Sequence, residues 1–248
     1  MPLGFSRSIF SKQAAAAAGP RSSITVNGDA QVDTARSKFG GASLLLDGTG
    51  DWLKASPSTS GDWDLTGDFT CECWFNFDAQ QYPNNSIILS SKETSSDSSS
   101  DIMFIILRNE DVPMRLQVQV GNQSLNFLGS GLISADTWIH VAISRSGSGS
   151  NNVGIFCAGQ RIGQITYNGT VSFENWGMGA LSLDGALPFN RTDSGWIDEV
   201  RLSDTSRYDP ASSTYIEPTA AFTNDANTLL LLHMNGSDGS TTFEDDEA

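Results

Sequence analysis

The chain consists of roughly a dozen short strand-like segments separated by turn residues, without any long stretch of the 3.6-residue helical period. The plainest segment is "DFTCECWFNFD", in which every second side chain over residues 69–77 is apolar. Strict alternation of this kind predicts a strand with one buried face. Many short strands at turn-rich spacing predict an all-β fold, in which two antiparallel sheets pack as a jelly-roll sandwich.

The length of 248 residues allows one domain of this kind with a sizeable core. We expect three parts: an N-terminal anchoring arm at 1–22, a jelly-roll domain at 23–220, and a C-terminal segment at 221–248. The last part contains a strand that completes the jelly roll, followed by an acidic tail.

The C-terminal segment contains the apolar run "TLLLLHM", residues 228–234, with no strand after it to pair with. A lone apolar strand needs partners for its backbone and cover for its side chains. We therefore expect this run to pair beside the strands at 42–46 and 196–203. The partner strands belong either to the same domain or to a neighbouring copy.

The arm carries three large apolar residues, Phe5, Ile9 and Phe10. These are too few to form a core, yet leaving them in water is unfavourable, so we expect the arm to dock on another protein. The arm lacks the apolar stretch of a secretory signal peptide, and no segment reaches the ~18 apolar residues of a membrane span. We expect synthesis in a cytoplasm.

The charge balance argues against a nucleic-acid binder. The chain has 14 Lys and Arg against 29 Asp and Glu, a net charge of −15, whereas nucleic-acid binding requires a basic face. Cys71 and Cys73 lie on one face of one strand, which is poor geometry for a disulfide. Together with Cys157 they are expected to be free core residues.

Four pieces of the sequence, in this order, resemble a known family: "KFGGASLLLDGTGDWL", "GDFTCECWFNF", "DTWIHVAISRSGS" and "GWIDEVRLSDTSRY". Over residues 24–216 the chain resembles laminin-G-like, concanavalin A-like jelly rolls, in particular those of virion proteins from tailed bacteriophages, including marine and cyanobacterial phages. In those chains a segment like "LLLLHMNGSDGSTTF" opens the domain, whereas here it stands at the far end. The resemblance therefore implies a circular permutation.

The resemblance implies a non-enzymatic structural protein of a bacteriophage virion, made in the host cytoplasm, that decorates the capsid or belongs to the tail or a fibre. Its partners would be other virion proteins, copies of itself and host-surface glycan. The alternative is a lectin-like, calcium-assisted carbohydrate-binding module.

The superfamily also includes glucan hydrolases, which need two carboxyl groups facing one cleft. The nearest candidates are Asp198 and Glu199, which as neighbours on a strand should point to opposite faces. We expect both to bond to loop backbone. His140 and His233 lie in apolar strands and are expected to be packed, hydrogen-bonded residues. No catalytic residue is predicted.

Two features could bind a ligand. Asp47 and Asp51 in "DGTGD", and Asp62 and Asp64 in "GDWD", could supply oxygen ligands to calcium, although Asp and Gly are also ordinary turn residues and the turn interpretation is favoured. Three tryptophans beside polar loops could stack on a sugar ring or simply cap the ends of the sandwich, the second being favoured. They are Trp52, Trp63 and Trp176.

Overall fold

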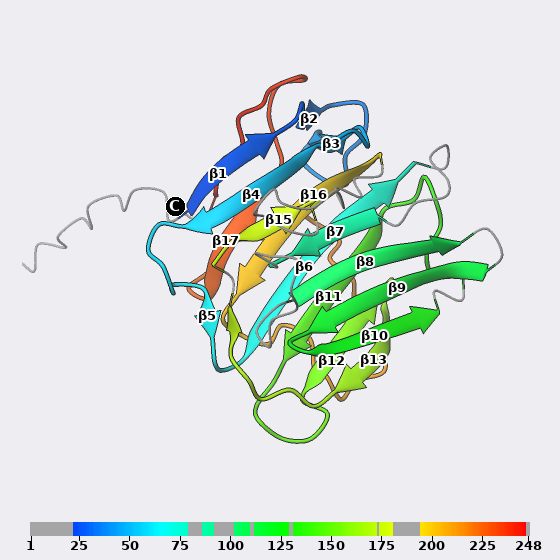
Figure 1. Ribbon diagram of the computed structural model, residues 1–248, viewed down its shortest axis with the longest axis vertical. Helices are drawn as coiled ribbons and strands as arrows, with labels where there is room; N and C mark the ends of the chain where they lie inside the picture. Colours follow the sequence, from blue (N-terminus) through cyan, green and yellow to red (C-terminus); the bar gives the residue numbers. More distant parts are fainter. Residues whose placement is uncertain are drawn as a thin grey trace, which may run out of the picture.

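The computed structural model describes residues 22–78, 86–91, 102–109, 112–128, 131–172, 174–180 and 194–246. Figure 1 shows two sheets, one lying behind the other, and every pairing between their strands is antiparallel. The predicted two-sheet jelly-roll sandwich is confirmed. Among the described residues, no helix has the length and hydropathy needed to cross a membrane.

The first sheet has seven strands, in the order β1 (Ser22–Asn27), β4 (Trp52–Pro57), β15 (Trp176–Met178), β7 (Ser86–Ser90), β8 (Ile102–Asn109), β9 (Val112–Val120) and β10 (Gln123–Leu128). The second has eight: β13 (Gln160–Ile165), β12 (Val153–Cys157), β11 (Ile139–Arg145), β6 (Phe69–Phe77), β16 (Gly195–Ser203), β3 (Ser43–Leu46) and β2 (Gln31–Asp33), with β17 (Thr228–Leu232) also paired to β16. Two short strands, β5 (Asp64–Leu65) and β14 (Val171–Ser172), form a small third sheet.

One hydrophobic core fills the space between the two large sheets. Leu53 of β4 and Val118 of β9 contribute from the first sheet, and Val141 of β11 contributes from the second. Cys71, Cys73 and Cys157 are free and buried, as predicted. Burial raises the pKa of each thiol, so these residues behave as small core side chains.

The second sheet is covered on its outer face as well. All nine residues of β6 are buried, so the prediction of a single buried face was wrong. The segment 204–227, which connects β16 to β17, crosses that outer face. Its Phe222 packs with Trp74 and Leu231 in a second apolar cluster, and the Tyr208 ring lies 5.8 Å from that of His140. Because β6 is covered on both faces, its polar side chains are buried as well, although the alternation of apolar and polar residues in its sequence predicts that they face solvent.

Strand β17 pairs with β16 in the same chain, which is the predicted pairing with residues 196–203. Strand β6 occupies one edge of β16, while β3 and β17 occupy successive lengths of the other edge. The strand at 42–46 thus lies end to end with β17 and is not hydrogen-bonded to it. Leu230 and Leu232 enter the main core, and Leu231 faces the outer cluster.

The chain after β17 is bound to the domain over its described length. The backbone of Gly239 and Ser240 exchanges hydrogen bonds with Val32 of β2, and Phe243 is buried in the core. Ser22, the last residue of the predicted arm, begins β1 and donates a hydrogen bond to Asp245 at 2.7 Å. The expected acidic tail is therefore part of the fold up to residue 246. Phe5, Ile9 and Phe10 lie outside the described residues.

Truncation after Pro218 should unfold the domain, because it removes β17 from the edge of β16 and exposes the core. Circular dichroism and thermal unfolding would measure this loss. Since β17 pairs within its own chain, the melting midpoint of the full chain should not change on dilution. A midpoint that falls on dilution would show that the strand is donated between copies, and a fully stable truncated protein would contradict both arrangements.

A matched pair of substitutions in β17 provides the control. Leu230 is fully buried, so Leu230→Ala should lower the free energy of unfolding by about 2–5 kcal/mol. Leu229 is only half-buried, and Leu229→Ala should cost about 1 kcal/mol or less.

Candidate functional site

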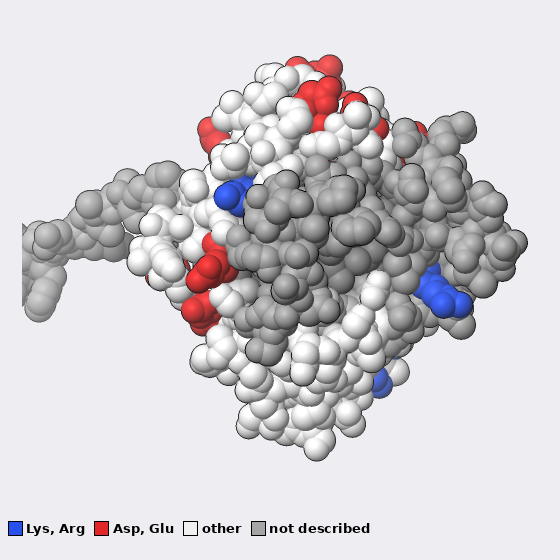
Figure 2. Space-filling model, in the orientation of Figure 1, with Lys and Arg blue, Asp and Glu red and all other residues white. Residues whose placement is uncertain are grey.

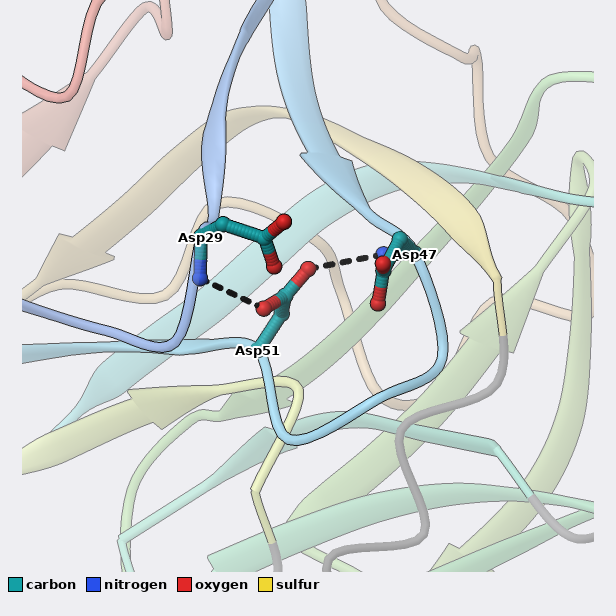
Figure 3. Close-up of side chains that lie close together, drawn as sticks. All are labelled: Asp29, Asp47 and Asp51. Atoms are coloured by element: carbon teal, nitrogen blue, oxygen red, sulfur yellow. Dashed lines mark hydrogen bonds between the residues drawn. The ribbon is translucent and has the colours of Figure 1, made fainter.

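Three aspartates meet at one end of the sandwich, as Figure 3 shows. Asp47 and Asp51 flank the turn between β3 and β4, and Asp29 lies in the turn after β1. One carboxylate oxygen from each lies within 4.8 Å of the other two. Asp47 and Asp51 were predicted as possible ligands because they lie in one turn. Asp29 was not predicted, because it belongs to a different turn and joins the cluster only in the folded chain.

Asp51 holds the two turns together. Its carboxylate accepts hydrogen bonds from the backbone N–H of Asp29 at 2.8 Å and of Asp47 at 2.9 Å. Burial is the main reason that the pKa of Asp51 is raised to about 6, since these hydrogen bonds act in the opposite direction. Gly28, with φ of 69°, is needed here because a Cβ would overlap the Asp51 carboxylate.

The cluster has the donor chemistry of a hard-cation site. Asp29 and Asp47 are exposed, and each carboxylate oxygen of Asp51 has a second lone pair beside the one used by an N–H. Ca²⁺ prefers oxygen ligands of this kind. Asp62 and Asp64 lie apart from the cluster: Asp64 accepts a hydrogen bond from Ser172 at 2.6 Å across the small third sheet.

The three tryptophans do not form a sugar-stacking platform. Trp63 and Trp176 are 2% and 1% exposed and belong to the main core, so neither can offer a ring face to a ligand. Trp52 is half-buried, at the start of β4. In β15, Trp176 points inward together with Met178. The polar loops beside these residues in sequence do not place them at the surface.

Asp198 and Glu199 sit at a β-bulge in β16, where the pairing with β6 shifts by one residue and Glu199 has φ of 52°. The bulge overturns the expectation that these neighbours point to opposite faces, because both bond to segments that cover the outer face. Asp198 Oδ2 accepts the backbone N–H groups of Lys38 and Phe39 at 2.7 and 3.1 Å.

Glu199 makes two similar contacts on the same side. It accepts the backbone N–H of Phe222 at 2.6 Å and pairs with His233 at 2.8 Å. The predicted role of Asp198 and Glu199, hydrogen bonding to loop backbone, is confirmed. Both residues are 0% exposed, so neither carboxyl group is accessible to solvent.

A buried ionic network that the sequence did not indicate lies next to this bulge. Glu72 is fully buried and receives hydrogen bonds from Arg201 at 2.6 Å and Tyr208 at 2.6 Å, with His140 at 3.1 Å. Burial alone would raise the pKa of Glu72, but the His140 hydrogen bond and the Arg201 charge outweigh it and lower the pKa to about 2. Glu72 is thus held ionised beneath the covering segment, and His140 is a packed, hydrogen-bonded residue as predicted.

Stability should fall as the pH rises from about 4 to about 7. Burial raises the pKa of Asp198 to about 7, against about 3.9 in an unfolded chain, so the folded state binds more protons throughout this window. Asp198 should contribute on the order of 3–4 kcal/mol to this change, and Asp51, whose pKa is raised to about 6, should add to it. Denaturant unfolding at both pH values measures the sum.

The variant Asp198→Asn isolates this group. Its amide oxygen can accept the two backbone N–H groups, while its NH₂ replaces Oδ1, which has no hydrogen-bond partner. The variant should therefore fold and lose the part of the slope between pH 4 and pH 7 that Asp198 contributes, while the part contributed by Asp51 remains. An unchanged slope would show that Asp198 is not the group that titrates.

Comparisons with known proteins agree with this architecture. Residues 47–210 match the family described as the concanavalin A-like lectin/glucanases superfamily. No curated protein sequence matches the chain. Among solved structures, the binding domain of botulinum neurotoxin serotype G has a TM-score of 0.54 at 13% identity, over 77% of this chain and 45% of that one.

The full-length tailspike protein 2 of Escherichia coli O157:H7 bacteriophage CAB120 gives a TM-score of 0.53 at 13% identity, over 79% of this chain and 27% of that one. The chain thus spans less than half the length of either structure, and identities this low establish likeness of fold alone. The family match covers well over half of the chain, and the protein therefore belongs to the concanavalin A-like lectin/glucanases superfamily.

Proposed function

We propose that this protein is a non-enzymatic structural component of a bacteriophage virion, on the capsid or in the tail, whose jelly roll contacts host-surface glycan. The resemblance of its strands to phage virion jelly rolls supports this role. So does the likeness in fold to a phage tailspike and to the binding domain of a neurotoxin. Within the virion its partners would be other virion proteins and copies of itself.

The observation that carries the non-enzymatic part is the burial of Asp198 and Glu199. In a glycoside hydrolase the two carboxyl groups must reach the scissile bond. Here both are fully buried and engaged with the backbone of the segments that cover β16. A substrate could reach these carboxyl groups only if the covering segments left the sheet. We therefore assign Asp198 and Glu199 a structural role.

The surface charge fits a role at protein and glycan surfaces. Among the described residues, Figure 2 shows acidic side chains at the top of the molecule, where Figure 1 places part of the C-terminal segment, and at its left side. The net charge of −15 disfavours binding to nucleic acid. The arm, residues 1–22, would supply the anchor to the particle through Phe5, Ile9 and Phe10.

The chain should be present in gradient-purified, washed particles, detected by mass spectrometry. Removal of residues 1–21 should leave the melting midpoint of the domain nearly unchanged and abolish incorporation into particles. A chain found only in lysate supernatant would overturn the virion role. Normal incorporation without the arm would overturn the anchoring role.

A second function, calcium-assisted carbohydrate binding, is favoured by the aspartate cluster. Three carboxylates within 4.8 Å repel one another, and a bound Ca²⁺ would relieve that repulsion and join the turns that carry Asp29, Asp47 and Asp51.

Millimolar CaCl₂ should raise the melting midpoint, and a chelator should lower it again. Binding stabilises a protein by about 2.7 kcal/mol when the ligand is at a hundred times its Kd. Asp29→Asn should remove the response because it removes one of the three carboxylates. Asp62→Asn, which changes an aspartate outside the cluster, should retain it. A midpoint that does not respond to either reagent would exclude calcium.

A further inference from the structure

The C-terminal segment encloses a hollow of about 300 Å³, and nothing assigned so far uses it. It lies between Met234 and Asp246, outside the residues that match the family. Small-molecule pockets have volumes of roughly 300–1,000 Å³. The hollow is at the lower end of that range, a size that suits one small ring and not an extended chain.

The frame of the hollow is fixed to the domain at several points. The backbone of Ser240 accepts the N–H of Val32, and Asp246 donates its N–H to the carbonyl of Leu231, both at 2.8 Å. Asp245 accepts the N–H of Leu231 at 3.1 Å and the hydroxyl of Ser22 at 2.7 Å. Because β17 and two other strands hold the frame, the hollow is present before any ligand arrives, which lowers the entropic cost of binding.

The lining combines two apolar residues with several polar ones. Met234 and Phe243 are only 3% and 8% exposed, so they offer the hollow a small apolar area. Asn235 and Thr242 carry side-chain donors. Asn235 lies against Gly40, which has φ of 66° and where a Cβ would overlap the amide of Asn235. The close approach to Gly40 positions this side chain.

Two carboxylates, Glu244 and Asp246, complete the lining, and no Lys or Arg is among the residues that line it. Asp246 accepts the backbone N–H of His233 at 3.4 Å through one oxygen. An anionic ligand would be repelled. A sugar ring matches the lining better, because its hydroxyls can donate to the carboxylates and accept from an amide or hydroxyl. The small exposed area of Met234 and Phe243 is enough for contact with part of the ring's C–H groups.

We propose that the hollow lined by residues from 234 to 246 is the binding pocket for a single neutral pyranose ring of host-surface glycan, with Glu244 and Asp246 accepting hydrogen bonds from its hydroxyl groups. This inference rests on the proposed glycan-binding function and names the site at which it occurs. It also gives the C-terminal segment a role beyond closing the second sheet.

Saturation-transfer NMR with the methyl glycosides of glucose, galactose, mannose and N-acetylglucosamine tests the proposal. At least one should bind, and N-acetylneuraminic acid should not. Glu244→Gln should weaken that binding by at least about tenfold, because it removes a charged acceptor. Because Glu244 is exposed, the Glu244→Gln variant should have the same melting midpoint as the unmodified chain. Glu174→Gln, the same change at an exposed site elsewhere, should bind as tightly as the unmodified chain.

The possible results test the location of the pocket separately from the proposed glycan-binding function. If Glu244→Gln binds the glycoside as tightly as the unmodified chain, the proposed pocket is wrong, but glycan binding by the protein is still supported. If none of the glycosides binds, but a glycan array gives hits that Glu244→Gln retains, the pocket is again wrong. The absence of any hit on the array would overturn glycan binding itself. Preferential binding of tetramethylammonium would show that the two carboxylates select a cation and not a sugar.

Discussion

The second sheet of this protein has to be covered on both faces, and much of the structure follows from that constraint. Strands β6 and β11 are buried along their whole length, so the outer face cannot be left in water. The 204–227 segment supplies the cover, with Tyr208 and Phe222 packed over His140. The same segment connects β16 to β17, which pairs with the free edge of β16. One length of chain therefore both covers the outer face of the sheet and supplies the strand that pairs with this edge.

Charged groups make this cover specific. Glu72 and Arg201 form an ion pair beneath it at 2.6 Å. Asp198 and Glu199 bond to the backbone of two crossing segments, and Glu199 also pairs with the side chain of His233. Apolar contacts would tolerate small shifts of the covering segment, whereas a buried carboxylate is satisfied only when its N–H donors are in place. The bulge at Glu199 aims both neighbouring carboxylates at the cover, and the hydrogen bond to Glu199 raises the pKa of His233. We infer that these groups fix where the segment lies.

Local patterns were sufficient for the fold class but not for the layers outside the sandwich. The strand at residues 69–77 and the free cysteines follow from neighbouring residues alone. The covering segment has no strand or helix pattern, so nothing in its sequence predicts where it packs. Trp63 and Trp176 are misjudged for a related reason, since adjacent polar loops say nothing about which way a ring points. Asp29 joins its cluster through a tertiary contact between two turns.

The two ends of the described chain show how a strand from the C-terminus can serve a domain that starts at β1. Ser22 and Asp245 are hydrogen-bonded although 223 positions separate them in sequence. A sandwich whose ends meet can be opened elsewhere and joined there with little change in its contacts. The position of β17 on the edge of β16 is what such a rearranged order requires, because the strand fills the same edge whether it precedes β1 or follows β16. Closing that edge also removes a template for pairing with other chains, and this benefit does not depend on the order of the strands.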